Sequence, residues 1–214
     1  MAALKSSAPN TAWAGTRPYG PDGPVDGSGS QRTILMEQVA YCLFDTSLGR
    51  CGIAWRGCDD SQAPPAVTLF QFPETTTAKT EASIARKSGA RARGAPPRRM
   101  VEIIEKVCQH LRGEVQDFRD VEVELNGASP FALLVYEAAR QIPAGQTRTY
   151  GELARELGRR GAARAVGRAL GSNPIGLIIP CHRVVAAGGK AGGFSAHGGW
   201  ATKTRLLVIE GARC

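Results

Sequence analysis

The sequence lacks long apolar runs and any regular cysteine pattern. No hydrophobic stretch approaches the about eighteen residues that cross a membrane, and the N-terminus shows no apolar segment typical of a secretory signal. The six cysteines are too few and too irregular for a disulfide scaffold, so free thiols in a reducing compartment are expected. We therefore expect a cytoplasmic or nucleoid protein, or a nuclear one in a eukaryote, with no membrane partner.

Metal-binding spacings are missing as well. Cys51 and Cys58 lie seven residues apart and Cys108 and His110 two apart, and neither spacing matches a conventional zinc motif. Ordinary buried thiols are the better interpretation of these cysteines. No metal and no cofactor is predicted.

Composition and charge are those of a globular protein with one basic half. Of the 214 residues, 43% are hydrophobic and 21% charged, which excludes collagen-like, coiled-coil and wholly disordered chains. The net charge of +8 resides in residues 129–214, which hold 12 Lys and Arg against 4 Asp and Glu, whereas residues 1–128 hold 15 of each sign. The basic half is either a solvated surface or a module that binds a polyanion.

The first half divides into a tail and a small α+β domain. Residues 1–33 are predicted to be a disordered tail, because the stretch over residues 17–30 is dense in Gly, Pro, Ser and Asp. Residues 34–128 are predicted to form a sheet with helices. The expected elements are a hairpin over 37–56 with its turn at 45–49, strands over 67–72 and 121–125, and helices over 77–87 and 100–111. In the hairpin, one face is assigned to Val39, Tyr41 and Leu43, continued by Cys51, Ile53 and Trp55.

Residues 129–214 are predicted to begin with three helices and to become β-rich afterwards. Ser129 and Pro130 begin the first helix, Thr149 opens the second, and residues 162–170 form the third. The inward positions expected in the first two are Phe131, Leu134, Val135, Ala138, Leu153 and Leu157. This order is typical of a winged-helix or helix-turn-helix module, so the predicted fold is α+β and the excess charge favours nucleic-acid binding.

A reactive triplet interrupts the apolar run Ile175–Val185. Cys181, His182 and Arg183 follow Pro180. Burying such polar and charged groups costs free energy, so their presence in an apolar run favours a functional role. A free thiol has a pKa of about 8.5, so a neighbouring base or cation is needed to form the thiolate at neutral pH. The alternative is a structural cysteine beside a surface histidine and arginine.

The predicted helix before this run is made of small residues around one long cation. Residues 162–167 read Ala-Ala-Arg-Ala-Val-Gly, with Arg164 in the middle. Either the small residues allow close helix packing, or the smooth face enters a DNA groove and Arg164 reaches into the base stack.

Several motifs of the second half form one recognisable set. They are Ile142-Pro143-x-Gly145-x-Thr147, Thr149-Tyr150-Gly151-x-Leu153-Ala154, Ala162-Ala163-Arg164-Ala165-Val166-Gly167, Asn173-Pro174, Ile179-Pro180-Cys181-His182-Arg183-Val184 and Lys203-x3-Leu207-x2-Glu210-Gly211. With them, residues 129–214 closely resemble the O6-alkylguanine-DNA alkyltransferases, also called methylated-DNA–protein-cysteine methyltransferases. The N-terminal half resembles that family in the order and length of its elements.

The resemblance implies a suicide DNA-repair enzyme, a methylated-DNA–protein-cysteine S-methyltransferase. Such a protein binds double-stranded DNA containing O6-alkylguanine, flips the damaged nucleotide out of the stack and transfers the alkyl group irreversibly to Cys181. O4-alkylthymine is a second candidate lesion. A monomer that acts once is expected.

The resemblance also implies roles for individual residues. His182 would take the Cys181 proton through a bridging water, and Glu210 would polarise His182. Tyr150 would donate a proton to the leaving guanine or rotate the phosphate, while Asn173 would orient the site. Arg164 would fill the gap left by the flipped base. Further expected DNA contacts are Ala163, Ala165, Gly167, Arg168, Tyr150 and Arg183. For Arg183, an internal ion pair is the alternative. The expected residues of the alkyl pocket are Pro174, Val184, Phe194 and Ser195.

The loop over residues 193–199 departs from the family pattern. Phe194 stands where many relatives have Tyr, and the loop is two residues longer before its Gly-Gly than the human-type loop, which leaves the pocket size open. His197 in this loop is interpreted as a solvated residue.

Three other functions are alternatives to alkyl transfer. Non-catalytic lesion binders of the family carry Trp at the nucleophile position, where this chain has Cys181. A transcriptional activator with a metal-binding half would need four clustered cysteines, which residues 1–128 lack. A Cys–His hydrolase or transferase acting on small molecules would turn over, and it leaves Arg164, the helix of small residues and the basic half unexplained.

Overall fold

The computed structural model describes residues 39–58, 64–90, 92–189 and 192–212. The tail predicted over residues 1–33 lies outside the described residues. Within the described ranges, no helix is long and apolar enough to cross a membrane.

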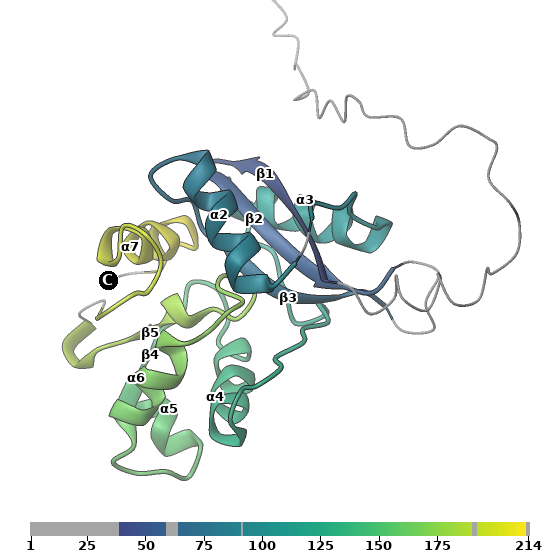
Figure 1. Ribbon diagram of the computed structural model, residues 1–214. Helices are drawn as coiled ribbons and strands as arrows, with labels where there is room; N and C mark the ends of the chain where they lie inside the picture. Colours follow the sequence, from purple (N-terminus) through teal and green to yellow (C-terminus); the bar gives the residue numbers. More distant parts are fainter. Residues whose placement is uncertain (1–38, 59–63, 91, 190–191, 213–214) are drawn as a thin grey trace, which may run out of the picture.

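A three-stranded antiparallel sheet forms the centre of the N-terminal half (Figure 1). Its strands are β1 (Val39–Thr46), β2 (Gly49–Arg56) and β3 (Ala66–Gln71), arranged in that order. The predicted hairpin is confirmed, with Thr46 paired to Gly49 and the positive φ of 119° at Gly49 accommodated by glycine.

The assignment of one common hairpin face is wrong. Tyr41 pairs with Ala54, whereas Ile53 pairs with Cys42. Paired residues share a face and neighbours along a strand do not, so Tyr41 and Ile53 lie on opposite sides of the sheet. Both faces are buried, which is why apolar residues occupy both sets of positions.

Helices α2 (Thr77–Ser88) and α3 (Arg98–Leu111) cover the two faces of the sheet, as Figure 1 shows. Ile84 of α2 packs with Tyr41, while Ile103 of α3 belongs to the core cluster that contains Ile53. Both helices were predicted, and α2 is capped by Thr76, whose side chain accepts a hydrogen bond from the Lys79 N–H group at 3.2 Å.

The strand predicted over residues 121–125 is wrong. Within the described residues, the ladder contact of this segment is one bridge between Val123 and Val67 of β3. The Val121 carbonyl accepts a hydrogen bond from Arg140 Nη2 at 2.9 Å instead of joining a strand. Alternating valines therefore reflect the burial of Val121 beside the sheet rather than a fourth strand.

The C-terminal half begins with the three predicted helices. These are α4 (Pro130–Arg140), α5 (Tyr150–Glu156) and α6 (Ala163–Gly171). The expectation of β-rich structure after them is wrong for residues 200–209, which form the helix α7 (Trp200–Ile209). Strand β4 (Arg148–Thr149) pairs in parallel with β5 (Val184–Val185), and two 3-10 turns span Cys181–Arg183 and Ala187–Gly189. The α+β class is confirmed, while the winged-helix description stays a prediction.

The inward face predicted for α4 is partly wrong. Leu134 is 53% exposed and Phe131 is only partly buried. The buried face is centred on Val135 and Tyr136, whose hydroxyl donates to the Ala169 carbonyl at 2.9 Å. Packing of α4 against α6 selects this face.

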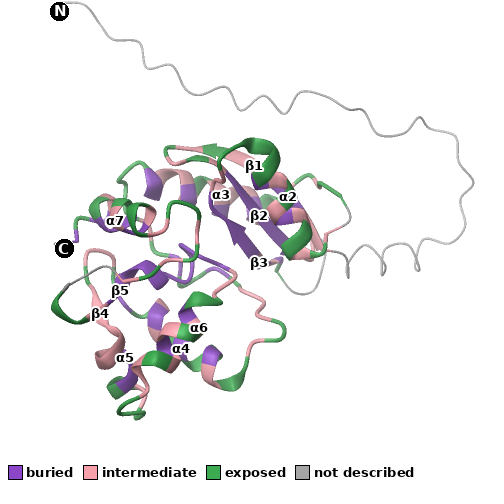
Figure 2. Ribbon diagram, turned by 60° about the vertical axis from the view of Figure 1, so that its left-hand side comes forward, coloured by how far each residue is buried: buried purple, intermediate pink, exposed green. Residues whose placement is uncertain are grey.

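One hydrophobic core joins the two halves. The run Ile175–Val185 is buried throughout, and the Phe70 N–H group of β3 donates to the Pro174 carbonyl at 2.9 Å. Figure 2 shows buried residues continuing from the sheet into the segment beside β5. The same core cluster contains residues from both sides of the predicted domain boundary between residues 128 and 129. The boundary itself stays a prediction.

Candidate active site

A cavity of about 540 Å³ lies beside the 3-10 turn Cys181–Arg183. This volume is within the range of small-ligand pockets. Its walls come from α6, the start of α5, the turn at Cys181 and the following loop. The lining residues named from the sequence are Tyr150, Ala163, Arg164, Gly167, Cys181, Phe194 and Ser195, and the others are Leu170, Gly171 and Gly193.

The 3-10 turn presents Cys181 at the cavity. The Cys181 N–H group donates to the Ile179 carbonyl at 2.8 Å, and the Arg183 N–H group donates to the Pro180 carbonyl at 2.9 Å. A turn removes the requirement that neighbouring residues point to opposite faces, so Cys181 and His182 can belong to one site. Cys181 is 8% exposed.

Burial raises the pKa of the Cys181 thiol, whereas a hydrogen bond from Asn173 and the positive charge of Lys203 lower it. The buried thiols of Cys42 and Cys51 have pKa values of about 12, raised by burial as well. Cys181 is thus a thiol at rest with partners that favour its ionised form, and a base is required to remove the proton.

Asn173 links the end of α6 to the buried run Ile175–Val185. Its Nδ2 donates to the Ile179 carbonyl at 2.9 Å, and its Oδ1 accepts from the Ile175 N–H group at 3.0 Å. These bonds on both sides of the amide fix the backbone that leads to Cys181.

Glu210 lies at the centre of a buried polar cluster. Its Oε1 is 2.9 Å from His182 Nε2, 2.9 Å from His110 Nε2 and 2.8 Å from Arg183 Nη2, and its Oε2 accepts from Arg183 Nε at 2.9 Å. Burial raises the pKa of Glu210, but hydrogen bonds from His110, His182 and Arg183 outweigh that effect and lower it well below its usual value. The carboxylate is therefore ionised.

His182 belongs to this cluster through the contact of its Nε2 with Glu210. Burial lowers the pKa of His182, while its hydrogen bond to Glu210 acts in the opposite direction. Among the described residues, His182 Nδ1 is a buried ring nitrogen with no hydrogen-bond partner. A neutral imidazole with Nε2 bound to a carboxylate has its other nitrogen available to accept a proton.

The two interpretations of Arg183 are resolved in favour of an internal ion pair. Its side chain is 8% exposed, binds Glu210 through two nitrogens and donates from Nη1 to the Ile142 carbonyl at 2.5 Å. The assignment of Arg183 to DNA contact is wrong, because its guanidinium is committed inside the protein.

Tyr150 is enclosed at the cavity wall beside a lysine. Its hydroxyl is 3.5 Å from Lys203 Nζ, and that ammonium lies 5.6 Å from the centre of the Tyr150 ring. A Cβ atom at Gly192 would lie 3.3 Å from the same hydroxyl, so a larger residue there would crowd it. Burial raises the pKa of Tyr150, which keeps the phenol protonated.

Helix α6 carries two exposed cations and small residues. Arg164 and Arg168 are exposed and four residues apart, so they share a face of the helix. Arg164 reaches the cavity, whereas Arg168 and Ala165 do not line it.

Two expected pocket residues lie elsewhere. Val184 is fully buried, and its carbonyl accepts from Lys203 Nζ at 2.6 Å. Pro174 turns its carbonyl to β3, where it accepts from Phe70. Neither residue lines the cavity. Val184 joins the run Ile175–Val185 to Lys203 of α7, and Pro174 joins the start of that run to β3.

The loop over residues 193–199 contributes to the cavity wall and contacts the N-terminal half of the chain. The Phe194 ring packs edge-on against Phe72, with ring centres 5.7 Å apart. His197 is 47% exposed, as expected for a solvated residue, and its Nδ1 lies 3.7 Å from Glu74 Oε2.

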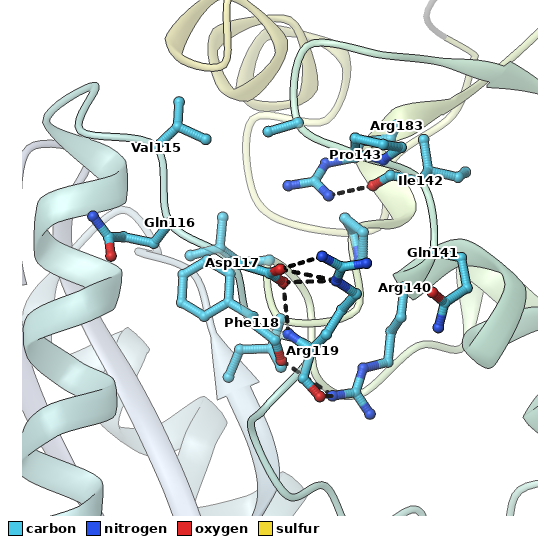
Figure 3. A pocket seen from close by; sticks show the side chains of 14 residues that line it. Val115, Gln116, Asp117, Phe118, Arg119, Arg140, Gln141, Ile142, Pro143 and Arg183 are labelled. Carbon is cyan, nitrogen blue, oxygen red and sulfur yellow. Dashed lines mark hydrogen bonds and ion pairs between the residues drawn. The ribbon is translucent and has the colours of Figure 1, made fainter.

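A second cavity of about 320 Å³ lies beside Arg183 and is lined in part by the segment 115–119 (Figure 3). Arg140 points toward that segment and donates to the carbonyls of Phe118 and Arg119. The cavity excludes Cys181 from its lining. In the described part of the chain, no group of three or more His, Cys, Asp or Glu could hold a metal ion.

Two buried residues of the site were not predicted. Lys203 occurs in a matched motif without a role, and its full burial beside Tyr150 could not be read from spacing. His110 was considered only as a metal ligand with Cys108, yet it binds Glu210 from 100 residues away.

The chain is similar to known proteins of one family. Residues 130–212 match the family model described as 6-O-methylguanine DNA methyltransferase, DNA binding domain. The methylated-DNA–protein-cysteine methyltransferase of Shigella flexneri is 34% identical over 178 residues, which cover 83% of this chain and 96% of the relative. The protein of the same name from Mycolicibacterium paratuberculosis is 45% identical over 114 residues, covering 53% and 67%.

Solved structures give the same result. The O6-methylguanine methyltransferase of Mycobacterium tuberculosis has a TM-score of 0.64 at 33% identity and covers 83% of this chain and 95% of that one. A structure of the Mycobacterium tuberculosis protein in complex with DNA has a TM-score of 0.62 at 33% identity, covering 80% and 92%.

Proposed function

Because this chain belongs to the methylated-DNA–protein-cysteine methyltransferase family and so acts in DNA repair by alkyl transfer, we propose that Cys181 is the alkyl acceptor. The substrate is O6-alkylguanine in double-stranded DNA, and the reaction is stoichiometric and irreversible. The observation that carries the proposal is the position of the Cys181 thiol in the wall of the cavity, next to the buried His182–Glu210 pair.

The thiol proton leaves before or during the attack. His182 accepts it at Nδ1 through a bridging water, and the ionised Glu210 stabilises the resulting imidazolium. The sulfur then forms a bond to the alkyl carbon as the bond from that carbon to O6 breaks, and the electron pair stays on guanine. The product is a thioether on Cys181, which no group in the site can cleave.

The leaving guanine requires a proton to remain neutral. Tyr150 supplies it from the cavity wall, where its raised pKa keeps the hydroxyl protonated. Lys203 lies 3.5 Å from that hydroxyl, and its charge stabilises the phenolate that would form. Together they prevent the build-up of negative charge on the departing base.

DNA binding is assigned to α6 and its surroundings. The exposed guanidinium of Arg164 lies at the cavity rim and occupies the gap left when the nucleotide is flipped into the pocket. Arg168 on the same face contacts the backbone phosphates, while Ala163 and Gly167 permit close approach of the groove. The proposal includes a monomer that acts in the cytoplasm or nucleoid, or in the nucleus of a eukaryote, with O4-alkylthymine as a second candidate lesion.

Replacing Cys181 by Ala tests the proposal. The variant should lose methyl transfer completely and keep its affinity for a duplex containing O6-methylguanine within about threefold, because the thiol contributes little to phosphate contacts. Native protein and Cys181→Ser serve as controls for binding. Residual methyl transfer by the alanine variant would contradict the assignment of Cys181.

A further inference from the structure

One member of the buried cluster comes from the N-terminal half of the chain. His110, on α3, is 0% exposed, and its Nε2 lies 2.9 Å from Glu210 Oε1. His182 and Arg183 bind the same oxygen, at 2.9 and 2.8 Å. His110 therefore contacts the carboxylate that binds His182, and it does not line the cavity.

The contacts of the His110 ring determine which nitrogen carries its proton. The Gln116 N–H group donates to His110 Nδ1 at 3.1 Å. A backbone N–H group can donate only to a ring nitrogen without a proton, so the proton of the neutral ring is on Nε2. That N–H group then points at Glu210. The Phe118 ring packs on the imidazole, with ring centres 5.2 Å apart, and holds its orientation.

We propose that His110 is a positioning residue for alkyl transfer, which fixes the Glu210 carboxylate and limits how strongly that carboxylate attracts the proton on His182. This role rests on the proposed function of His182 as the base. Two imidazole N–H groups share Oε1, so the bond from His110 reduces the charge that the oxygen offers to His182.

The groups that face the carboxylate are few and come from two elements. Among the described residues they are His110 from α3, and His182 and Arg183 from the turn that holds Cys181. Hydrogen bonds from His110, His182 and Arg183 keep Glu210 ionised, and the positive charge of Arg183 acts to lower the pKa of His182. Without His110, His182 becomes a stronger base that is already protonated at a higher pH, and the carboxylate is free to rotate.

The test compares three substitutions at His110 by single-turnover methyl transfer from an O6-methylguanine duplex between pH 5.5 and 9. His110→Phe keeps a ring and loses both nitrogens. His110→Asn keeps an amide near the Gln116 N–H group but is too short to reach Glu210. His110→Gln places a donor near the position of Nε2. The acid limb of the rate profile should move up by about one pH unit in the Phe and Asn variants, the order expected for one lost hydrogen bond to a carboxylate.

The rate above the acid limb should fall about tenfold in the Phe and Asn variants, and His110→Gln should restore both the limb and the rate to within about threefold of native. Ile103→Val is the matched control, since it removes a buried methyl group from the same helix without touching Glu210. It should lower stability and leave the pH profile unchanged.

The outcomes separate the two proposals. A folded His110→Asn or His110→Phe variant with the native pH profile would overturn the role of His110 while the native protein still transfers methyl groups. A native protein that moves no methyl group would overturn the proposed function itself, and this role with it. A shifted acid limb that His110→Gln reverses supports the proposal.

Discussion

Removing the charge of Glu210 should be among the most damaging single changes in this protein. Glu210→Gln keeps the size of the side chain and its ability to accept hydrogen bonds. It removes the negative charge that faces Arg183, whose side chain is 8% exposed and which binds both carboxylate oxygens. The arginine would then be a buried charge without a counterion.

The size of the effect follows from that unpaired charge. Breaking a buried ion pair from one side costs about 3–5 kcal/mol. A typical domain is stable by about 5–15 kcal/mol, so the variant would lose a large share of its stability. With a denaturant slope of roughly 2 kcal/mol per molar urea, the unfolding midpoint should fall by about 1.5–2.5 M.

Urea unfolding at pH 7.5 measures this loss directly. Glu137→Gln is the matched control, because Glu137 is exposed and its side chain accepts one hydrogen bond, from Gln141. It should change the midpoint by less than about 0.3 M. Adding Arg183→Met to Glu210→Gln should recover part of the loss, because the uncompensated charge is gone. A midpoint shift below about 0.5 M for Glu210→Gln would contradict the buried ion pair.

Two further predictions concern DNA and acid. Arg164→Ala should slow methyl transfer from duplex DNA by about ten- to a hundredfold, because Arg164 acts on base extrusion. Transfer from a free modified base needs no extrusion and should slow by less than about twofold. Equal slowing of both substrates in single-turnover assays would refute the role of Arg164 in extrusion. Stability should fall with acid in two stages. His182 and Glu210 both have lower pKa values in the folded state, so their contributions are complete above the unfolded values of 6.5 and 4.5 and are lost as the pH falls below each. Urea midpoints at pH 8, 6 and 4 should decrease in that order, and a constant midpoint would be inconsistent with these shifts.

Local sequence signals predicted the helices well. The threonine before α2 and the serine before α4 both act as caps, and Thr149 with Glu152 forms a capping box that begins α5. These signals work because the capping contacts lie within a few residues of one another. The matched motifs likewise identified Tyr150, Arg164 and Cys181, which all line the cavity.

Errors arose where distant packing decides the outcome. Leu134 was expected inside, but the contact of Tyr136 with α6 turns that side of α4 to solvent. The assignment of Arg183 required knowing that Glu210 lies beside it in a dry interior. His110 and Lys203 carry no local signal, since their partners lie 100 and 53 residues away in the sequence.

Intact-protein mass spectrometry tests alkyl transfer to Cys181 most directly. The purified chain is incubated with excess duplex containing O6-methylguanine, and the adduct is located by peptide mapping. We predict one added methyl group per protein, located on Cys181, with no further increase at longer times. An unchanged mass, a second methyl group, or a methyl group on another residue would contradict stoichiometric transfer to Cys181.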